Sequence, residues 1–244
     1  MESLSEFKNN NAYDLSVRFS SDGFSLFVYN ENGSVLSSKT VLSSLFRLTE
    51  REVLAILLAE TETKLEFKKT RIICEFDDFT IIPAVFFKAE QRRSMLAFEH
   101  DLDRTDSVLF NKLPAFDAIN IFSVPEGFYR GIKQVFPLIA IEHQVSFLLT
   151  DLAKKTSDDS LQIYVRSKMM DIVAISDMKL KLVNRFQFFT PEDFIYHCLH
   201  VMELLSLHPD TCHIFLFQSV PNPELKNLLS KYVQFCTTAD ISRA

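Results

Sequence analysis

Glycine is scarce in this chain, at 4 of 244 residues, against a usual share of about 7%. Loops that cradle phosphate groups depend on glycine, because without a Cβ the backbone amides can approach the ligand closely. The sequence contains no Walker-type loop, no G-x-S-x-G and no H-E-x-x-H motif. The chain therefore lacks the local sequence motifs that are typical of P-loop nucleoside triphosphatases, α/β-hydrolases and zinc proteases.

Features that would indicate a nucleic acid, a membrane or secretion are also missing. The formal net charge of −6 disfavours nucleic-acid binding, which usually needs a positive surface. No apolar run approaches the ~20 residues that span a bilayer, and the start lacks the basic and apolar regions of a signal peptide. The four cysteines have no C-x-x-C spacing and are expected to be reduced thiols. We therefore expect a soluble, cytoplasmic protein with no membrane span and no nucleic-acid partner.

What the chain does contain is a strand pattern that occurs twice. Apolar residues alternate over Leu15–Phe19, Ser20–Gly23 predicts a turn, and alternation resumes over Phe24–Val28. The same pattern returns over Leu161–Val165 and Met170–Ala174. A third strand and then a helix follow in both copies.

Each of these helices has a recognisable start. Thr49-x-x-Glu52 has the spacing of a capping box, in which the threonine oxygen and the glutamate carboxylate bond to free amides. Thr190-Pro191-Glu192-Asp193 predicts a second start, with threonine as cap, proline in the first turn and acids near the positive end of the helix dipole.

After each helix comes an apolar strand that ends in Val-Pro and leads into another helix. The first pair is Ala118–Pro125 with Phe128–Phe136, and the second is His213–Pro221 with Leu225–Val233. The order β-β-β-α-β-α thus occurs twice, which indicates an internal duplication. Residues Thr237–Ala244 are expected to form a loose tail.

The two copies predict two domains of one α/β protein. The first half is expected over residues 12–155 and the second over residues 159–236. The first half carries extra residues after its first helix, at about 65–116, which we interpret as a β-rich insertion. Strands are expected in the insertion at Arg71–Phe76 and Phe79–Ile82, since Asp77-Asp78 suits a turn between them.

A duplicated β-β-β-α-β-α unit with an interrupted first copy resembles the actin-like ATPase superfamily, whose halves are ribonuclease H-like. The sharpest local likeness is Val124-Pro125-x-x-Phe128, which is similar to the V-P-x-x-F of DnaK-type chaperones. The whole chain also resembles a functionally uncharacterised family from Bacteroidota. This resemblance implies an actin-like ATPase fold of two ribonuclease H-like halves, with an inserted β-rich subdomain in the first.

The same resemblance implies three glycine-containing elements around ATP, and the sequence departs from all three. The first hairpin, Val17–Gly23, has no aspartate on its strand, and the second, Val165–Met170, has neither glycine nor aspartate. Phe217-Gln218-Ser219 stands where a glycine pair is expected at the adenosine. The positions left for a degenerate nucleotide cleft are Arg18, Asp22, Gly23, Lys168 and Ser219.

We therefore expect a non-catalytic, actin-like protein that acts as an interaction or scaffold module. No catalytic residue, metal or cofactor is expected, ATP is not the expected ligand, and an unidentified protein would bind the insertion or a Phe-rich surface. The alternative is a nucleotide-binding protein, ATPase or kinase of the same superfamily with unconventional phosphate loops. A metal-dependent activity at the histidine and cysteine residues between His197 and His213 is a third hypothesis, but solvated or capping histidines are the favoured interpretation.

Overall fold

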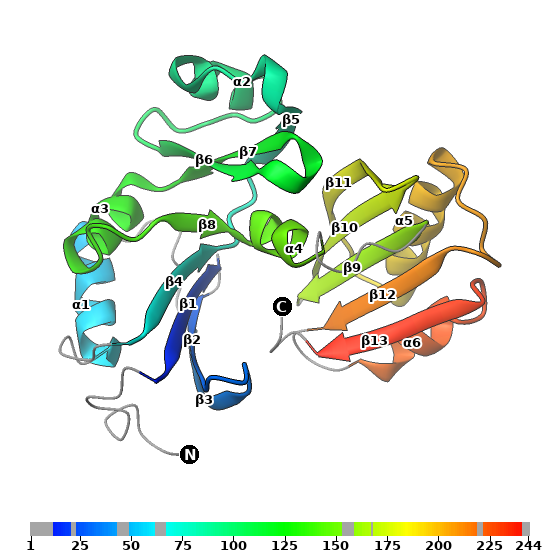
Figure 1. The fold of residues 1–244 in the computed structure, drawn as a ribbon, viewed down its shortest axis with the longest axis horizontal. Helices are drawn as coiled ribbons and strands as arrows, with labels where there is room; N and C mark the ends of the chain where they lie inside the picture. Colours follow the sequence, from blue (N-terminus) through cyan, green and yellow to red (C-terminus); the bar gives the residue numbers. More distant parts are fainter. Residues whose placement is uncertain are drawn as a thin grey trace. The chain divides into compact units, whose positions relative to one another are not determined.

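The computed structural model describes residues 12–20, 23–42, 49–61, 67–152, 159–166, 168–218 and 222–240. The chain divides into two compact units, residues 1–150 and 151–244 (Figure 1). Each unit contains a five-stranded sheet. Among the described residues, no helix combines the length and the apolar character needed to cross a membrane.

The sheet of the first unit has the strand order β3-β2-β1-β4-β8. Strands β1, β2 and β3 pair antiparallel, whereas β4 and β8 add in parallel beside β1. The strands are β1 (Asp14–Ser20), β2 (Gly23–Tyr29), β3 (Val35–Leu42), β4 (Lys69–Cys74) and β8 (Ile141–His143). The first three are those that the alternating sequence predicts, because the apolar residues of β1 and β2 alternate with polar or less buried ones.

Three helices accompany this sheet: α1 (Glu50–Thr61), α3 (Glu126–Val135) and α4 (Gln144–Leu152). The predicted capping box is present at the start of α1, where the Glu52 carboxylate accepts from the Thr49 amide at 2.7 Å. Helix α3 packs on α1 through Gly131, at which an added Cβ would lie 2.7 Å from the Cβ of Val53. A glycine is therefore required where the two helices meet.

The β-rich insertion is a three-stranded antiparallel sheet with the order β5-β7-β6. Its strands are β5 (Phe79–Pro83), β6 (Ser107–Leu113) and β7 (Ala118–Val124), with α2 (Arg92–Leu96) and 3-10 helices at Ala84–Phe86, Ala89–Gln91 and Pro114–Phe116. A small core fills it, made of Leu96, Val108, Ile119 and Ile121.

Two strand assignments from the sequence are wrong. Arg71–Phe76, expected in the insertion, lies almost entirely in β4, which pairs with β1 in the main sheet. Ala118–Val124, expected to match His213–Pro221 as the fourth strand of its half, is the central strand of the insertion. Both segments are short and mostly apolar, and the sequence of such a segment does not indicate which sheet it joins. The insertion's sheet therefore follows β4 and ends just before α3.

The sheet of the second unit has the order β11-β10-β9-β12-β13, with the same sequence of antiparallel and parallel pairings. Its strands are β9 (Ser160–Arg166), β10 (Met169–Ser176), β11 (Lys179–Gln187), β12 (His213–Gln218) and β13 (Phe235–Asp240). Helices α5 (Pro191–Leu204) and α6 (Pro223–Leu229) share one apolar core with one face of this sheet.

Two end segments also differ from expectation. Residues Thr237–Asp240, predicted to be part of a loose tail, belong to β13 and pair in parallel with β12. Glu142 and His143 belong to the short strand β8, which the sequence pattern did not predict, and the helix α4 begins at Gln144. In both cases the last parallel strand of the sheet was missed. A short strand at the edge of a sheet carries little periodicity of its own.

Candidate functional site

The first predicted phosphate hairpin is formed by the antiparallel strands β1 and β2. Ser20 pairs with Gly23 across the hairpin, and the Ser20 hydroxyl donates to the Gly23 carbonyl at 3.2 Å. The loop residue Asp22 lies outside the described residues, as does Ser219 of the predicted adenosine position. The other three predicted residues, Arg18, Gly23 and Lys168, lie within the described residues.

Arg18 lies on the face of β1 opposite the apolar core of Leu15, Val17 and Phe19. It is 6% exposed. Its guanidinium carbon lies 5.3 Å from the ring centroid of Phe27 and 5.5 Å from that of Phe147. The structure therefore places Arg18 among aromatic rings, in the geometry of a cation–π contact.

Arg71 and Tyr29 complete this aromatic–cation cluster. The Arg71 guanidinium carbon lies 5.3 Å from the same Phe147 ring, so two arginines flank one phenylalanine of α4. Burial raises the pKa of Tyr29, and the charge of Arg18 and its hydrogen bond to Tyr29 partly oppose that rise. The cluster holds β1, β2, β4 and α4 together on this face of the first unit.

Lys168 lies at the second predicted phosphate hairpin, which connects β9 to β10 and pairs Arg166 with Met169. Its Nζ is 5.6 Å from the ring centroid of Phe189, and its carbonyl accepts from the Phe188 amide at 2.9 Å. Lys168 belongs to the second unit and Arg18 to the first. Both predicted cations thus contact aromatic rings within their own units.

The described residues nearest to the predicted adenosine position are Gln218, at the end of β12, and Asn222, just before α6. The Gln218 amide nitrogen donates to the Asn222 carbonyl at 3.0 Å, and its oxygen accepts from the Asn222 amide at 3.2 Å. Asn222 in turn caps α6 by accepting from the Glu224 amide at 3.0 Å. Gln218 and Asn222, which precede and follow Ser219 in the sequence, are therefore joined by two hydrogen bonds.

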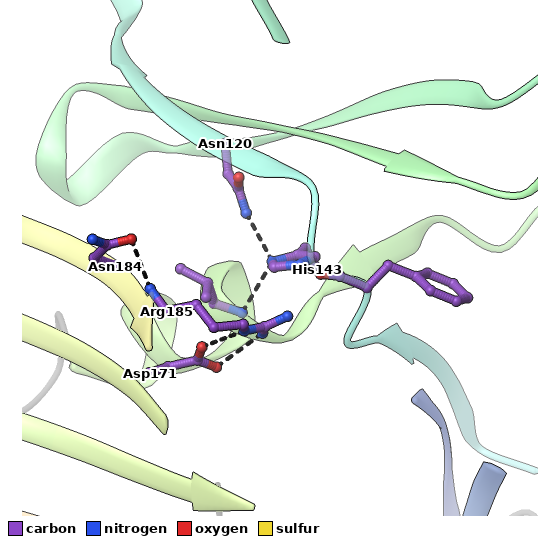
Figure 2. A network of polar contacts seen from close by, with 7 residues as sticks. Asn120, His143, Asp171, Asn184 and Arg185 are labelled. Atoms are coloured by element: carbon purple, nitrogen blue, oxygen red, sulfur yellow. Dashed lines mark hydrogen bonds and ion pairs between the residues drawn. The ribbon is translucent and has the colours of Figure 1, made fainter. Parts of the chain in front are cut away.

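The first unit contains a buried polar network that the sequence analysis missed (Figure 2). Asn120 of β7 lies 3.2 Å from His143 Nδ1 and donates to the Ser146 hydroxyl at 2.8 Å. Asn111 of β6 accepts from the His143 amide at 2.8 Å. Asn120 and His143 are 0% exposed. The network joins the insertion to β8 and α4.

The hydrogen-bond pattern of His143 fits the tautomer with its proton on Nε2. Nδ1 faces two N–H donors, the Asn120 side chain and the Val145 amide, whereas Nε2 lies 3.0 Å from the Phe76 carbonyl. The sequence signal for this network is an asparagine inside an otherwise apolar strand, Ala118–Val124. Such a residue predicts a buried partner.

The second unit contains a buried ion pair, also visible in Figure 2. Arg185 donates through Nε to Asp171 Oδ1 at 2.6 Å and through a terminal nitrogen to Oδ2 at 3.0 Å. The two residues are direct partners in the β10–β11 register. The sequence signal for this ion pair is again a polar residue inside an apolar strand, in Met170-Asp171-Ile172.

The histidines of α5 contact aromatic rings, and two cysteines of the second unit are buried. The His197 ring lies 4.7 Å from that of Phe186, and the His200 ring lies 5.7 Å from that of Tyr196. Burial raises the pKa of the Cys198 thiol, and it raises the pKa of Cys212 to about 11. Within the described part of the chain, no group of three His, Cys, Asp or Glu side chains is arranged to hold a metal ion.

Comparison with known proteins identifies the fold. The chain is similar to a Bacteroides thetaiotaomicron protein with an actin-like ATPase fold and unknown function, with 24% identity, a TM-score of 0.81, and 98% of this chain and 94% of that one covered. It is also similar to a chain of the PilM-PilN type IV pilus biogenesis complex (9% identity, TM-score 0.56, 94% and 89% covered). A third similar structure is the ethanolamine utilization protein EutJ from Carboxydothermus hydrogenoformans (9% identity, TM-score 0.54, 97% and 88% covered).

These likenesses confirm the expected α/β fold of the actin-like ATPase type. No curated protein matches the chain in sequence. A family model matches residues 3–236, which is nearly the whole chain. The chain belongs to the family described as "Protein of unknown function (DUF3822)".

Proposed function

We propose that this protein is a non-catalytic interaction module built on the actin-like ATPase fold, with a degenerate nucleotide site. The observation that carries the proposal is the placement of Arg18, which is 6% exposed and packed between the rings of Phe27 and Phe147. A cation that binds a phosphate must present its N–H groups to the ligand. The Arg18 guanidinium instead packs against these two rings and bonds to Tyr29, which links β1 to β2 and α4.

The use of glycine supports the same proposal. Gly131 is required for the packing of α3 on α1, and Gly33 provides a positive φ of 73° in the β2–β3 turn. These are roles in folding. Phosphate loops need glycine for a different reason, the close approach of backbone amides to an anion.

The insertion is the surface that we propose for a protein partner. Val85, Phe86 and Phe98 are 80%, 68% and 89% exposed, although the insertion already has its own core. Exposed aromatic side chains of this kind are enriched at protein interfaces. The similar chain from the PilM-PilN complex provides a precedent for this fold in a protein assembly.

Calorimetric titration with ATP and magnesium tests the loss of the nucleotide site. We expect no saturable heat up to millimolar nucleotide. A saturable heat at micromolar affinity would overturn the proposal and favour the alternative, a nucleotide-binding protein with unconventional loops. In that case Arg18→Ala and Lys168→Ala would be the first variants to titrate.

The partner surface is tested with variants of the insertion. We expect Phe86→Ser and Phe98→Ser to abolish a specific complex that wild-type protein forms, whereas Leu138→Ser, which changes a leucine 96% exposed outside the insertion, leaves it intact. Arg93 is unsuitable for this test. Its guanidinium donates to the carbonyls of Asp103 and Asp106, so its replacement would disturb the insertion itself.

A further inference from the structure

The outward face of α5 carries an aromatic and apolar stripe. The inward residues of this helix are buried, namely Phe194, Ile195, Cys198, Val201 and Met202. On the other side Tyr196, His200 and Leu204 follow one another at intervals of four residues, which places them on one face. Tyr196 is 62% exposed and Leu204 is 63% exposed.

This stripe is fixed in place by ring stacking. The Tyr196 ring is stacked on His200 with an interplanar angle of 3°, and it contacts His197 edge-on at 5.3 Å. His197 in turn stacks on Phe186 of β11. A side chain that is already ordered in the free protein loses little conformational entropy on binding, and tyrosine is enriched among the residues that dominate binding energy.

The charged residues of α5 itself are all acidic, and a cation near its start, Lys168, lies against the ring of Phe189. Helix α5 contains no lysine or arginine, and its exposed acids Glu192 and Glu203 lie at its two ends. They are eleven positions apart along the helix, which corresponds to about 16 Å. Asp193 is occupied by the capping box with Thr190, so the two glutamates are the acids of α5 available to a partner.

We propose that this face of α5 docks an amphipathic helix of another protein, whose apolar side packs on Tyr196 and Leu204 and whose basic residues pair with Glu192 and Glu203. Charge complementarity selects this occupant, because an acidic rim attracts a basic partner and repels a second acidic surface. An amphipathic helix presents apolar residues three to four positions apart, which matches the stripe. The inference rests on the proposed function as an interaction module and adds a second surface to it.

The test uses a fluorescently labelled, 14-residue amphipathic peptide of leucine and lysine, and the same peptide with glutamate in place of lysine. We expect the basic peptide to bind wild-type protein saturably and the acidic peptide not to bind. The double variant Glu192→Lys/Glu203→Lys should weaken binding at least tenfold, and Tyr196→Ser should weaken it similarly. A matched variant, Glu31→Lys/Asp177→Lys, makes the same change of charge at exposed acids outside both α5 and the insertion, and it should bind as wild type does.

Several results would overturn the inference. One is equal weakening by both charge-reversal variants, which would mean that the peptide follows net charge and not α5. Another is the absence of saturable binding by the basic peptide. A third is a dimer of the protein that Tyr196→Ser dissociates, because a second copy would then occupy this face. All three leave the nucleotide titration unaffected, so a failure here is distinct from a failure of the proposed function.

Discussion

Asp171 and Arg185 form a two-point ion pair directly across β10 and β11, with side chains 0% and 5% exposed. Removing one partner of such a pair leaves a buried charge, which typically costs about 3–5 kcal/mol, whereas replacing both by apolar residues costs far less. We therefore expect Arg185→Met to destabilise the second unit by about that amount.

The double variant Asp171→Leu/Arg185→Met provides the control for this prediction. It should be more stable than Arg185→Met alone, because it also removes the buried carboxylate that has lost its arginine. Urea denaturation followed by circular dichroism measures both free energies of unfolding. A loss below about 1 kcal/mol for Arg185→Met, the range of an exposed pair, would contradict the buried geometry.

The capping box of α5 predicts a dependence of stability on pH. The amides of Phe189 and Thr190 donate to the Asp193 carboxylate and hold its pKa below the usual value. Because the pKa is lower in the folded state, this contribution is present at neutral pH and is lost as the pH falls from about 4 through the folded pKa. Asp193→Asn should flatten that part of the profile.

Melting temperatures of wild type and Asp193→Asn between pH 6 and pH 2.5 measure this difference. Glu52 gives a matched case in the first unit, since hydrogen bonds from the Thr49 amide and hydroxyl lower its pKa. Glu52→Gln should therefore show the same change of slope. Parallel profiles for wild type and both variants would show that neither carboxylate is linked to folding.

The tip of the β10–β11 hairpin holds a methionine in a backbone conformation that favours glycine. Asp177 has φ 51° and Met178 has φ 60°, which is the left-handed geometry of a type I′ turn. We expect Met178→Gly to stabilise the second unit by about 0.5–1 kcal/mol, because relief of strain exceeds the added entropy of the unfolded chain.

Ser176→Gly is the matched control at the same hairpin. Ser176 is a strand residue paired with Lys179, so glycine there should cost about 0.5–1 kcal/mol. Thermal unfolding monitored by circular dichroism distinguishes the two variants. If both glycine substitutions lowered the melting temperature, the left-handed geometry at Met178 would not be a source of strain.

The contact of α3 with α1 predicts that Gly131→Ala destabilises the first unit. Alanine normally favours a helix over glycine by about 1 kcal/mol, but here the new Cβ would meet Val53 at 2.7 Å. Overpacking of this kind costs about 1–3 kcal/mol. Chemical denaturation measures the sign of the effect, and a net gain in stability would show that the helices separate without cost.

Much of the local structure could be predicted from the sequence. The predicted helix starts at Thr49 and Thr190 and the predicted hairpins β1–β2 and β9–β10 are confirmed, because each depends on residues a few positions apart. The placement of Arg18 could not be predicted. Its role depends on Phe147, which lies far along the chain in α4. The buried partners of Asp171 and Asn120 could not be predicted either. A polar residue in an apolar strand indicates that a partner exists, but it does not indicate which residue the partner is.

The sequence by itself determined the α/β class, the repeated strand pattern and the starts of α1 and α5. Tertiary structure alone decided that Arg71–Cys74 joins β1, that Ala118–Val124 lies between β5 and β6, and that Phe235–Asp240 adds to β12. The physical reason is the range of the interactions. Helix caps and tight turns are stabilised within a few residues, whereas strand pairing and side-chain burial are selected by partners brought close only when the chain folds.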